Sequence, residues 1–270
     1  MTNAPPARIS LDFGFQGPSY TLTASNQSGS CAIANAADLI RGGNVDVVVA
    51  GGVDTLLTPN SIHRFNYLDL LTTRNSLPQS AVKPFDKHRD GFALSDGGCV
   101  LLLESAEHAR QRNARVYAYL TGYGTLPCTA DQLHSGMSDA MNMALEKAEL
   151  PPEAVDYIHA SGLATIDSDW HEAKAVRHVF GRHAAQVRVS SCIPMTGHTM
   201  SANGAIGVAV SALALKTGYL PPAINLTTPD PECALNFVPV NTIRPYDLSA
   251  VMNNAFGIDG SHWSMILQSV

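Results

Sequence analysis

Residues Ala202–Lys216 restrict the fold of this chain more than any other stretch, because they are apolar nearly all round. A helix without a polar face must be covered on every side. A second predicted helix, Ser28–Arg41, consists largely of small residues that allow other backbones to approach closely, and Gly42 and Gly43 follow it in the C-cap region. Two buried helices need layers of structure around them, so the sequence predicts a layered α/β fold.

Strand-like and helix-like segments alternate along the rest of the chain. Val45–Ala50 is rich in β-branched residues, which is typical of a strand covered on both faces. Two more helices are predicted at Ser138–Glu149 and Ser168–Phe180, and Asp167 or Ser168 could cap the second. The other predicted strands are Tyr20–Ala24, Val100–Leu103, Val116–Gly122, Tyr157–Ala160, Val187–Ser190, Val251–Phe256 and Ser264–Leu267.

Composition excludes several classes of function. The chain has 270 residues, of which 45% are apolar, so it can bury a large core. Its formal charge of −6 argues against a nucleic-acid partner, and without a Lys/Arg cluster we expect no membrane partner. The sequence contains no run of 18 apolar residues, so we expect no membrane span. Met1–Ser10 does not have the pattern of a signal peptide.

The cysteines point to an intracellular protein. They are odd in number and irregularly spaced, and they contain no CxxC pair that would indicate zinc. We therefore expect buried thiols in a cytoplasmic protein that binds neither a metal nor a cofactor. The five cysteines are Cys31, Cys99, Cys128, Cys192 and Cys233.

Four ordered motifs together resemble the β-ketoacyl-carrier-protein synthases, or ketosynthases, of the thiolase fold. The motifs are Gly17-Pro18-Ser19 with Gln27-Ser28-Gly29, Lys83–Phe92, Met195–His198, and Pro222–Leu226 with Asn236–Pro239. The resemblance runs from about Arg8 to the C-terminus. It implies a thiolase-like layered α-β-α-β-α fold with a truncated first half, residues 1–115, and a complete second half, residues 116–270.

The resemblance also implies that about the first third of a typical ketosynthase is missing before Met1. Outer strands and helices of the first sheet would then be absent. Their loss would leave a sheet edge and apolar surface that a soluble protein must cover. A partner chain is the simplest cover.

Asn26 stands where elongating ketosynthases carry their cysteine nucleophile, when the segment from Gly17 to Gly29 is aligned without a gap. A carboxamide is not readily deprotonated and does not hold a thioester. Asn is also a favoured helix N-cap, and that structural role is compatible with catalytic loss. Cys31 lies more than a turn further along the helix, so we do not expect it to substitute.

The two histidine positions of the family differ in this chain. Ser161 stands at the first, and His159, two residues earlier on the same strand face, is expected to pack rather than catalyse. His198 retains the second, with a hydrogen-bonded core histidine as the structural alternative. Ile193 replaces the lysine that the family carries five residues before this histidine.

The family's gate loop, Gly-Phe-Gly-Gly, reads Gly257-Ile258-Asp259-Gly260 here. An inward-facing carboxylate at Asp259 would oppose a developing oxyanion. Losing the nucleophile, one histidine, the lysine and the gate together predicts a chain without a catalytic residue. We therefore expect it not to be an enzyme on its own, but an inactive subunit of a β-ketoacyl-carrier-protein synthase complex.

Scaffold positions of the family persist. Asp90, Asp96 and Gly97 match its turns, while Asp169 and Glu172 match acidic positions at a helix start, where carboxylates favour the helix dipole. The resemblance further implies that one strand pairs with its twofold mate across a dimer. The residues of this dimer strand are Tyr20, Thr21, Leu22, Thr23 and Ala24.

Within the family, this pattern resembles the chain length factor, the non-elongating subunit of type II polyketide ketosynthases, and points to the aryl polyene type. It implies pairing with an active ketosynthase, in a heterodimer or higher hetero-oligomer, to stabilise it and shape the acyl tunnel. Acyl carrier protein would be met through that partner. Two alternatives remain. One is a malonyl-carrier-protein decarboxylase that uses His198 with the backbone donors of Asn26 and Ile258. The other is a degenerate fragment that associates with itself.

Overall fold

A computed structural model describes residues 2–129, 132–241 and 244–270. A six-stranded sheet has the order β3-β8-β7-β4-β5-β6, and a two-stranded sheet pairs β1 with β2. The strands are β1 Val47–Asp54, β2 Gly97–Glu104, β3 Tyr119–Pro127, β4 Tyr157–His159, β5 Arg188–Ser190, β6 Asn236–Phe237, β7 Ala250–Phe256 and β8 Ser261–Gln268. The α-helices are α1 Ala4–Phe13, α2 Ser28–Arg41, α3 Pro59–Tyr67, α4 Ala106–Gln111, α5 Leu133–Ala148, α6 Ile166–Phe180, α7 Ile193–Thr196 and α8 Asn203–Thr217.

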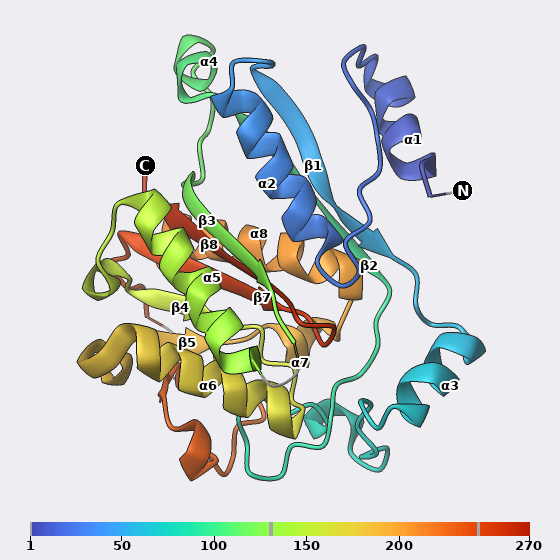
Figure 1. Ribbon diagram of the computed structural model, residues 1–270, viewed down its shortest axis with the longest axis vertical. Helices are drawn as coiled ribbons and strands as arrows, with labels where there is room; N and C mark the ends of the chain where they lie inside the picture. The colour runs from blue at the N-terminus through green and yellow to red at the C-terminus, as the bar shows by residue number, and fades with distance from the viewer. Residues whose placement is uncertain (1, 130–131, 242–243) are drawn as a thin grey trace.

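The elements form layers, as Figure 1 shows. Helices α5 and α6 cover one face of the six-stranded sheet, and α8 lies behind it, against β7. Helix α8 also contacts α2 and the small β1–β2 sheet, so it is enclosed between two sheets as its apolar sequence predicted. This is the thiolase-like α/β fold that the motifs implied.

Small residues hold the middle layer together. A Cβ atom at Gly29 of α2 would fall 2.7 Å from the carbonyl oxygen of Ser201, and one at Gly204 of α8 would collide with the hydroxyl of Ser30. The two helices can therefore meet only because these positions lack side chains. The limits of α2 agree with the predicted Ser28–Arg41, while most other elements differ from prediction by a few residues at their ends.

Two predictions about strands are wrong. Tyr20–Ala24 is not a strand, because among the described residues no neighbouring strand supplies a ladder to it and only Ala24 makes an isolated bridge, to Asn26. The β1–β2 sheet is covered on one face rather than two. Its inner face packs on α2 and α8, whereas Val53, Val100 and Leu102 are more than half exposed.

The parallel part of the large sheet brings distant segments to one edge. Strands β7, β4 and β5 are neighbours and run parallel, with Tyr157 paired to both Val251 and Arg188. Their carboxyl ends therefore open at the same edge, where ligand sites of such sheets form. The segments that follow them contain the gate loop, Ser161 and His198.

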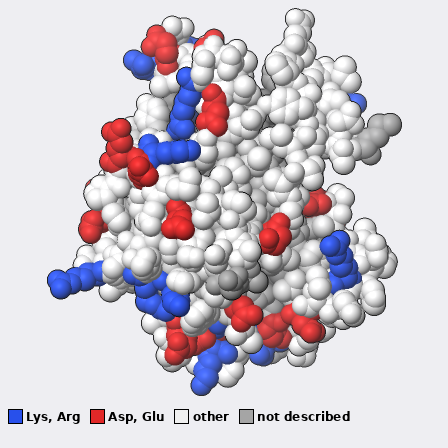
Figure 2. Space-filling view, viewed as in Figure 1, with Lys and Arg blue, Asp and Glu red and all other residues white. Residues whose placement is uncertain are grey.

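The surface adds two observations. Acidic and basic side chains are interspersed on the face that Figure 2 shows, without a broad patch of one sign. Within the described residues, no helix is both long and apolar enough to cross a membrane.

Candidate functional site

Four segments meet at this edge of the sheet. The side chain of Gln27, at the start of α2, reaches the gate loop at Gly257. The hydroxyl of Ser161 is hydrogen-bonded to the backbone of Phe256, the last residue of β7. Ser201, which follows the His198 segment, donates a hydrogen bond of 3.4 Å to the carbonyl of Ser25, next to Asn26. The structure thus joins the segments that carry the three positions predicted from sequence.

Asn26 lies buried at a sharp bend. The preceding Ser25 has a left-handed backbone with φ 48°, a strained conformation that often marks functional sites. The N-cap prediction for Asn26 is wrong, because α2 begins at Ser28 and its N-cap is Gln27. Ser28 itself closes the bend, accepting from the amide of Ala24 at 3.0 Å and donating to the carbonyl of Ser25 at 2.8 Å. The Asn26 carboxamide is left in the interior, and its Nδ2 has no hydrogen-bond partner among the described residues.

Gln27 is a site residue that sequence reasoning missed. With its amide oriented to satisfy both ends, its oxygen accepts from the amide of Gly257 and its nitrogen donates to the carbonyl of Ala255, each at 3.2 Å. The side chain is 2% exposed, so these bonds are shielded from water. Gln27 therefore ties the start of α2 to the gate loop. The only signal in the sequence was a long polar side chain beside the nucleophile position.

The hydroxyl of Ser161 is already occupied. It accepts from the amide of Phe256 at 3.2 Å and lies 3.3 Å from the carbonyl of the same residue. The amides of Ser161 and Gly162 each donate to the carboxylate of Glu172 at 2.9 Å. Burial raises the pKa of Glu172 to about 7. Glu172 thus holds the Ser161 loop in place, a more specific role than the predicted interaction with the helix dipole.

Asp169 does the same for the neighbouring loop. Its carboxylate accepts from the amides of Phe85 at 2.7 Å and Ala164 at 3.0 Å. The cap of α6 is Thr165, which accepts from the amide of Ser168 at 3.3 Å, so neither Asp167 nor Ser168 is the cap. Two buried carboxylates of one helix thereby shape the site through backbone amides.

His198 is buried at this edge of the sheet, without a hydrogen bond to its ring from the described residues. Its ring is 1% exposed, lies 4.7 Å edge-on from the ring of Phe92, and neither ring nitrogen has a hydrogen-bond partner among the described residues. The structure therefore does not show the hydrogen-bonded core histidine that was the alternative. Burial lowers the pKa of His198 to about 4, so the imidazole is neutral at pH 7. Ile193 and Ile258 belong to the apolar cluster that includes Phe92.

Asp259 does not face the site. Its Oδ1 accepts from the amide of Ser261 at 3.2 Å and from the hydroxyl of Ser261 at 2.5 Å. Burial acts to raise the pKa of Asp259, but hydrogen bonds from Ser261 and Ser25 outweigh it and hold the pKa below its usual range. The residue is exposed, so the inward carboxylate considered from sequence is not present.

His159 lies away from Ser161. It is buried against α8, where a Cβ atom at Gly207 would fall 3.1 Å from its Nδ1, and it pairs in register with Asn253. Burial lowers the pKa of His159 to about 4. Its position between β4 and α8 is that of a packing residue.

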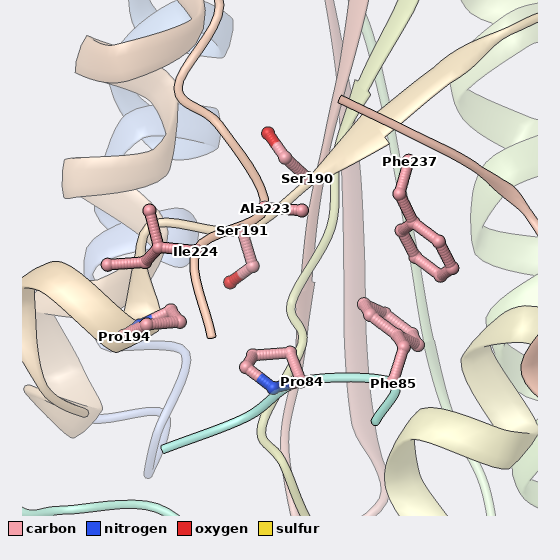
Figure 3. Close-up of a pocket in the computed structure, with 8 residues that line it drawn as sticks. All are labelled: Pro84, Phe85, Ser190, Ser191, Pro194, Ala223, Ile224 and Phe237. Atoms are coloured by element: carbon pink, nitrogen blue, oxygen red, sulfur yellow. The ribbon is translucent and has the colours of Figure 1, made fainter. Parts of the chain in front are cut away.

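A small pocket opens beyond the end of β5, separate from Asn26 and His198. Figure 3 shows the residues that line it: Pro84, Phe85, Ser190, Ser191, Pro194, Ala223, Ile224 and Phe237. The two serine hydroxyls are already used, since Ser190 donates to the carbonyl of Pro221 at 2.6 Å and Ser191 to that of Ser161 at 3.1 Å. The pocket therefore offers mainly apolar surface. In the described part of the chain, no three His, Cys, Asp or Glu side chains are grouped to hold a metal ion.

Comparison with known families agrees with this architecture. Residues 1–109 match the model of the β-ketoacyl synthase N-terminal domain, and residues 118–227 match that of its C-terminal domain. The chain belongs to the β-ketoacyl synthase family. A 3-oxoacyl-(acyl-carrier-protein) synthase 2 of Coxiella burnetii is 37% identical over 99% of this ketosynthase-family chain, which spans 66% of that relative's length.

Solved structures show the same likeness. A type II polyketide synthase acyl-carrier protein in complex with its ketosynthase bound to the hexaketide matches with a TM-score of 0.94 and 32% identity, covering 99% of this chain and 67% of that one. The ishigamide ketosynthase/chain length factor matches with a TM-score of 0.91 and 30% identity, covering 100% of this chain and 66% of that one.

These likenesses overturn one expectation. The prediction that the chain is not an enzyme on its own is wrong, because a relative that is 37% identical over 99% of it is named as a synthase. The prediction took the changes at the nucleophile, first histidine, lysine and gate positions together as loss of all chemistry. His198, buried and neutral, remains at the second histidine position.

Proposed function

We propose that this ketosynthase-family chain works in carrier-protein-dependent fatty-acid or polyketide biosynthesis, paired with a second, elongating ketosynthase chain. In this role it stabilises the partner and shapes the acyl tunnel, as a chain length factor does. Its own helix start does not form the acyl thioester from which chain elongation proceeds.

The interior carboxamide of Asn26 is the observation that carries the proposal. It occupies the bend at the start of α2, where the family places a thiol, and an amide does not form a thioester. The Gly257 amide of the gate loop is committed to the protein itself, because it donates to the carbonyl of Ser261 at 2.7 Å and lies 3.2 Å from the side-chain oxygen of Gln27. The likeness to a ketosynthase/chain length factor structure supports the pairing.

Native mass spectrometry of the chain, expressed with the elongating ketosynthase of its own pathway, tests the pairing. We expect a one-to-one complex. Thr23→Pro should weaken it at least tenfold, because proline removes the N–H that a paired strand would bind. Thr23→Val, which keeps that N–H, should leave it intact. Thr23 is exposed, so neither change disturbs the core.

A homodimer that ignores the ketosynthase would contradict the proposal. Equal complex formation by Thr23→Pro and wild type would instead locate the interface outside the predicted dimer strand. Unfolding midpoints of both variants control for an indirect effect.

Decarboxylation of malonyl-carrier protein is a second candidate, favoured by the unpartnered ring of His198. A neutral imidazole can donate an N–H to the thioester carbonyl while the carboxylate leaves as carbon dioxide, which stabilises the enolate that forms. The apolar surroundings, which include Phe92 and Ile258, strengthen such a bond.

The assay for this candidate measures carbon dioxide released from malonyl-carrier protein. His198→Ala should lower the rate about 100-fold, as removal of one oxyanion donor does. His63→Ala, on the exposed face of α3, serves as the control. The pKa of His198 is about 4, below the ordinary 6.5, so the ring stays neutral and the rate should be constant between pH 6 and 8. Background-level release by wild type and His198→Ala alike removes this candidate.

A further inference from the structure

Cys128 and His262 form a thiol–imidazole pair beside the gate loop. Cys128 follows β3, His262 lies in β8, and the two strands pair antiparallel so that Leu126 is opposite His262. The Sγ atom of Cys128 lies 3.1 Å from Nε2 of His262. This is the contact that a nucleophilic thiol makes with its base. The amide of Cys128 also donates to the carbonyl of Gly260 at 2.9 Å, so the cysteine is anchored to the gate loop itself.

The imidazole of His262 is enclosed and neutral. The ring of His262 is 0% exposed and lies edge-on to Phe256, with ring centroids 5.2 Å apart. Among the described residues, the charged groups that act on its pKa are Asp259 of the gate loop and His171 of α6. Burial lowers the pKa of His262 to about 4, against a smaller opposing effect of Asp259, so the ring is neutral at pH 7 but is a weaker base than a free imidazole. The 3.1 Å contact between Sγ and Nε2, and not the pKa, therefore carries the assignment.

Glycine at position 136 leaves room for the thiol of Cys128, which is half-buried. Helix α5 passes so close that a Cβ atom at Gly136 would fall 2.8 Å from Sγ, which means that glycine there leaves room for the sulfur. Cys128 is half-buried, and the flanking Pro127 and Thr129 are exposed. By contrast Cys192 and Cys233 are buried, and no such imidazole contact is recorded for them among the described residues.

We infer that Cys128 is an acyl acceptor, with His262 as its general base, for acyl groups delivered as carrier-protein thioesters. The donor class rests on the proposed function; the thiol–imidazole contact does not. The pair adjoins the gate loop of a site whose Asn26 position does not bear a thiol.

The transfer is a thioester exchange and needs no other reactant. The Cys128 thiol passes its proton to Nε2 of His262 while Sγ attacks the acyl carbonyl. The carbon–sulfur bond to the carrier breaks, and the departing thiolate takes the proton from His262. The products are an acyl thioester on Cys128 and a free carrier thiol.

The experiment incubates the full chain with octanoyl-carrier protein, and separately with octanoyl-N-acetylcysteamine, followed by intact-mass and peptide mass spectrometry. We expect one hydroxylamine-sensitive octanoyl group on the peptide that contains Cys128. Cys128→Ala should abolish it, and His262→Asn should slow it about 100-fold, as loss of a general base does. Cys31→Ala should leave it unchanged, since Cys31 is a half-buried thiol on α2 whose pKa burial raises.

A second arm does not depend on how the variants fold. Folded wild-type chain whose Cys128 has been alkylated with iodoacetamide should accept no octanoyl group. Acyl groups spread over Cys31 and Cys99, no label on wild type, or equal rates for wild type and His262→Asn would each overturn the inference. Since acylation requires no ketosynthase partner, a chain that forms no complex but labels at Cys128 would defeat the proposed pairing and leave this inference standing.

Discussion

Arg89→Met is expected to lower the free energy of unfolding by about 3–5 kcal/mol, the cost of removing one member of a buried charge pair. Arg89 is buried, and its guanidinium lies 2.7 Å from the carboxylate of Asp230 and 3.6 Å from that of Asp169. It also donates to the carbonyls of Asp86 and Ile166, each at 2.9 Å. Methionine fills similar volume but satisfies none of these groups.

The fate of Asp169 explains the size of this effect. Burial raises the pKa of Asp169 to about 7 even with Arg89 nearby. Without the guanidinium, its carboxylate must either remain charged in the interior or take up a proton and weaken its bonds to the Phe85 and Ala164 amides. Loss of Arg89 should therefore loosen the start of α6 together with the loop that precedes Phe85.

Urea unfolding of Arg89→Met and of Arg112→Met measures the difference. Arg112 is also bonded to a carboxylate, that of Glu104, but its side chain is 49% exposed, so its loss should change stability little. Similar unfolding midpoints for the two variants would mean that the Arg89 cluster contributes no more than a surface pair.

The sequence predicted those features of the fold that depend on neighbouring residues alone. The limits of α2 follow from its small residues and from the glycines after Arg41, and the buried position of α8 follows from its lack of a polar face. Ordered motifs predicted Asn26, Ser161 and His198 as site positions, because each lies next to an element whose type was clear. These features depend on a few consecutive residues.

The remaining features depend on contacts that no short stretch contains. Tyr20–Ala24 has strand composition, but a strand needs a partner, and no strand in the described part of the chain lies beside it. Gln27 satisfies an amide at Gly257, and Cys128 meets His262 across 134 positions of sequence. Likewise, the sequence predicted that Asp169 and Glu172 interact with the dipole of α6. The structure shows that their carboxylates accept hydrogen bonds from backbone amides of neighbouring loops.

Gly124→Ala is expected to destabilise the chain by about 3 kcal/mol, as overpacking of a tight interior does. Gly124 lies in β3 where α5 crosses it. A Cβ atom there would collide with the carbonyl oxygen of Ala140 and fall 2.7 Å from Cβ of Met143 and 2.8 Å from the amide nitrogen of Ala144. Two of these three atoms are backbone, so no side-chain rotation relieves the clash, and α5 must move away from the sheet.

The same displacement gives this variant a second readout. Helix α5 carries Gly136, which faces the Cys128–His262 pair, so moving the helix away from the sheet should widen the space around Sγ and speed alkylation of Cys128 relative to wild type. Gly17→Ala is the matched control, because a Cβ atom at Gly17 meets nothing within 4 Å. Urea unfolding of both variants measures the loss of stability directly. If Gly124→Ala unfolds at the same urea concentration as Gly17→Ala, then α5 adjusts without cost, and the close contact between β3 and α5 does not limit the stability of the fold.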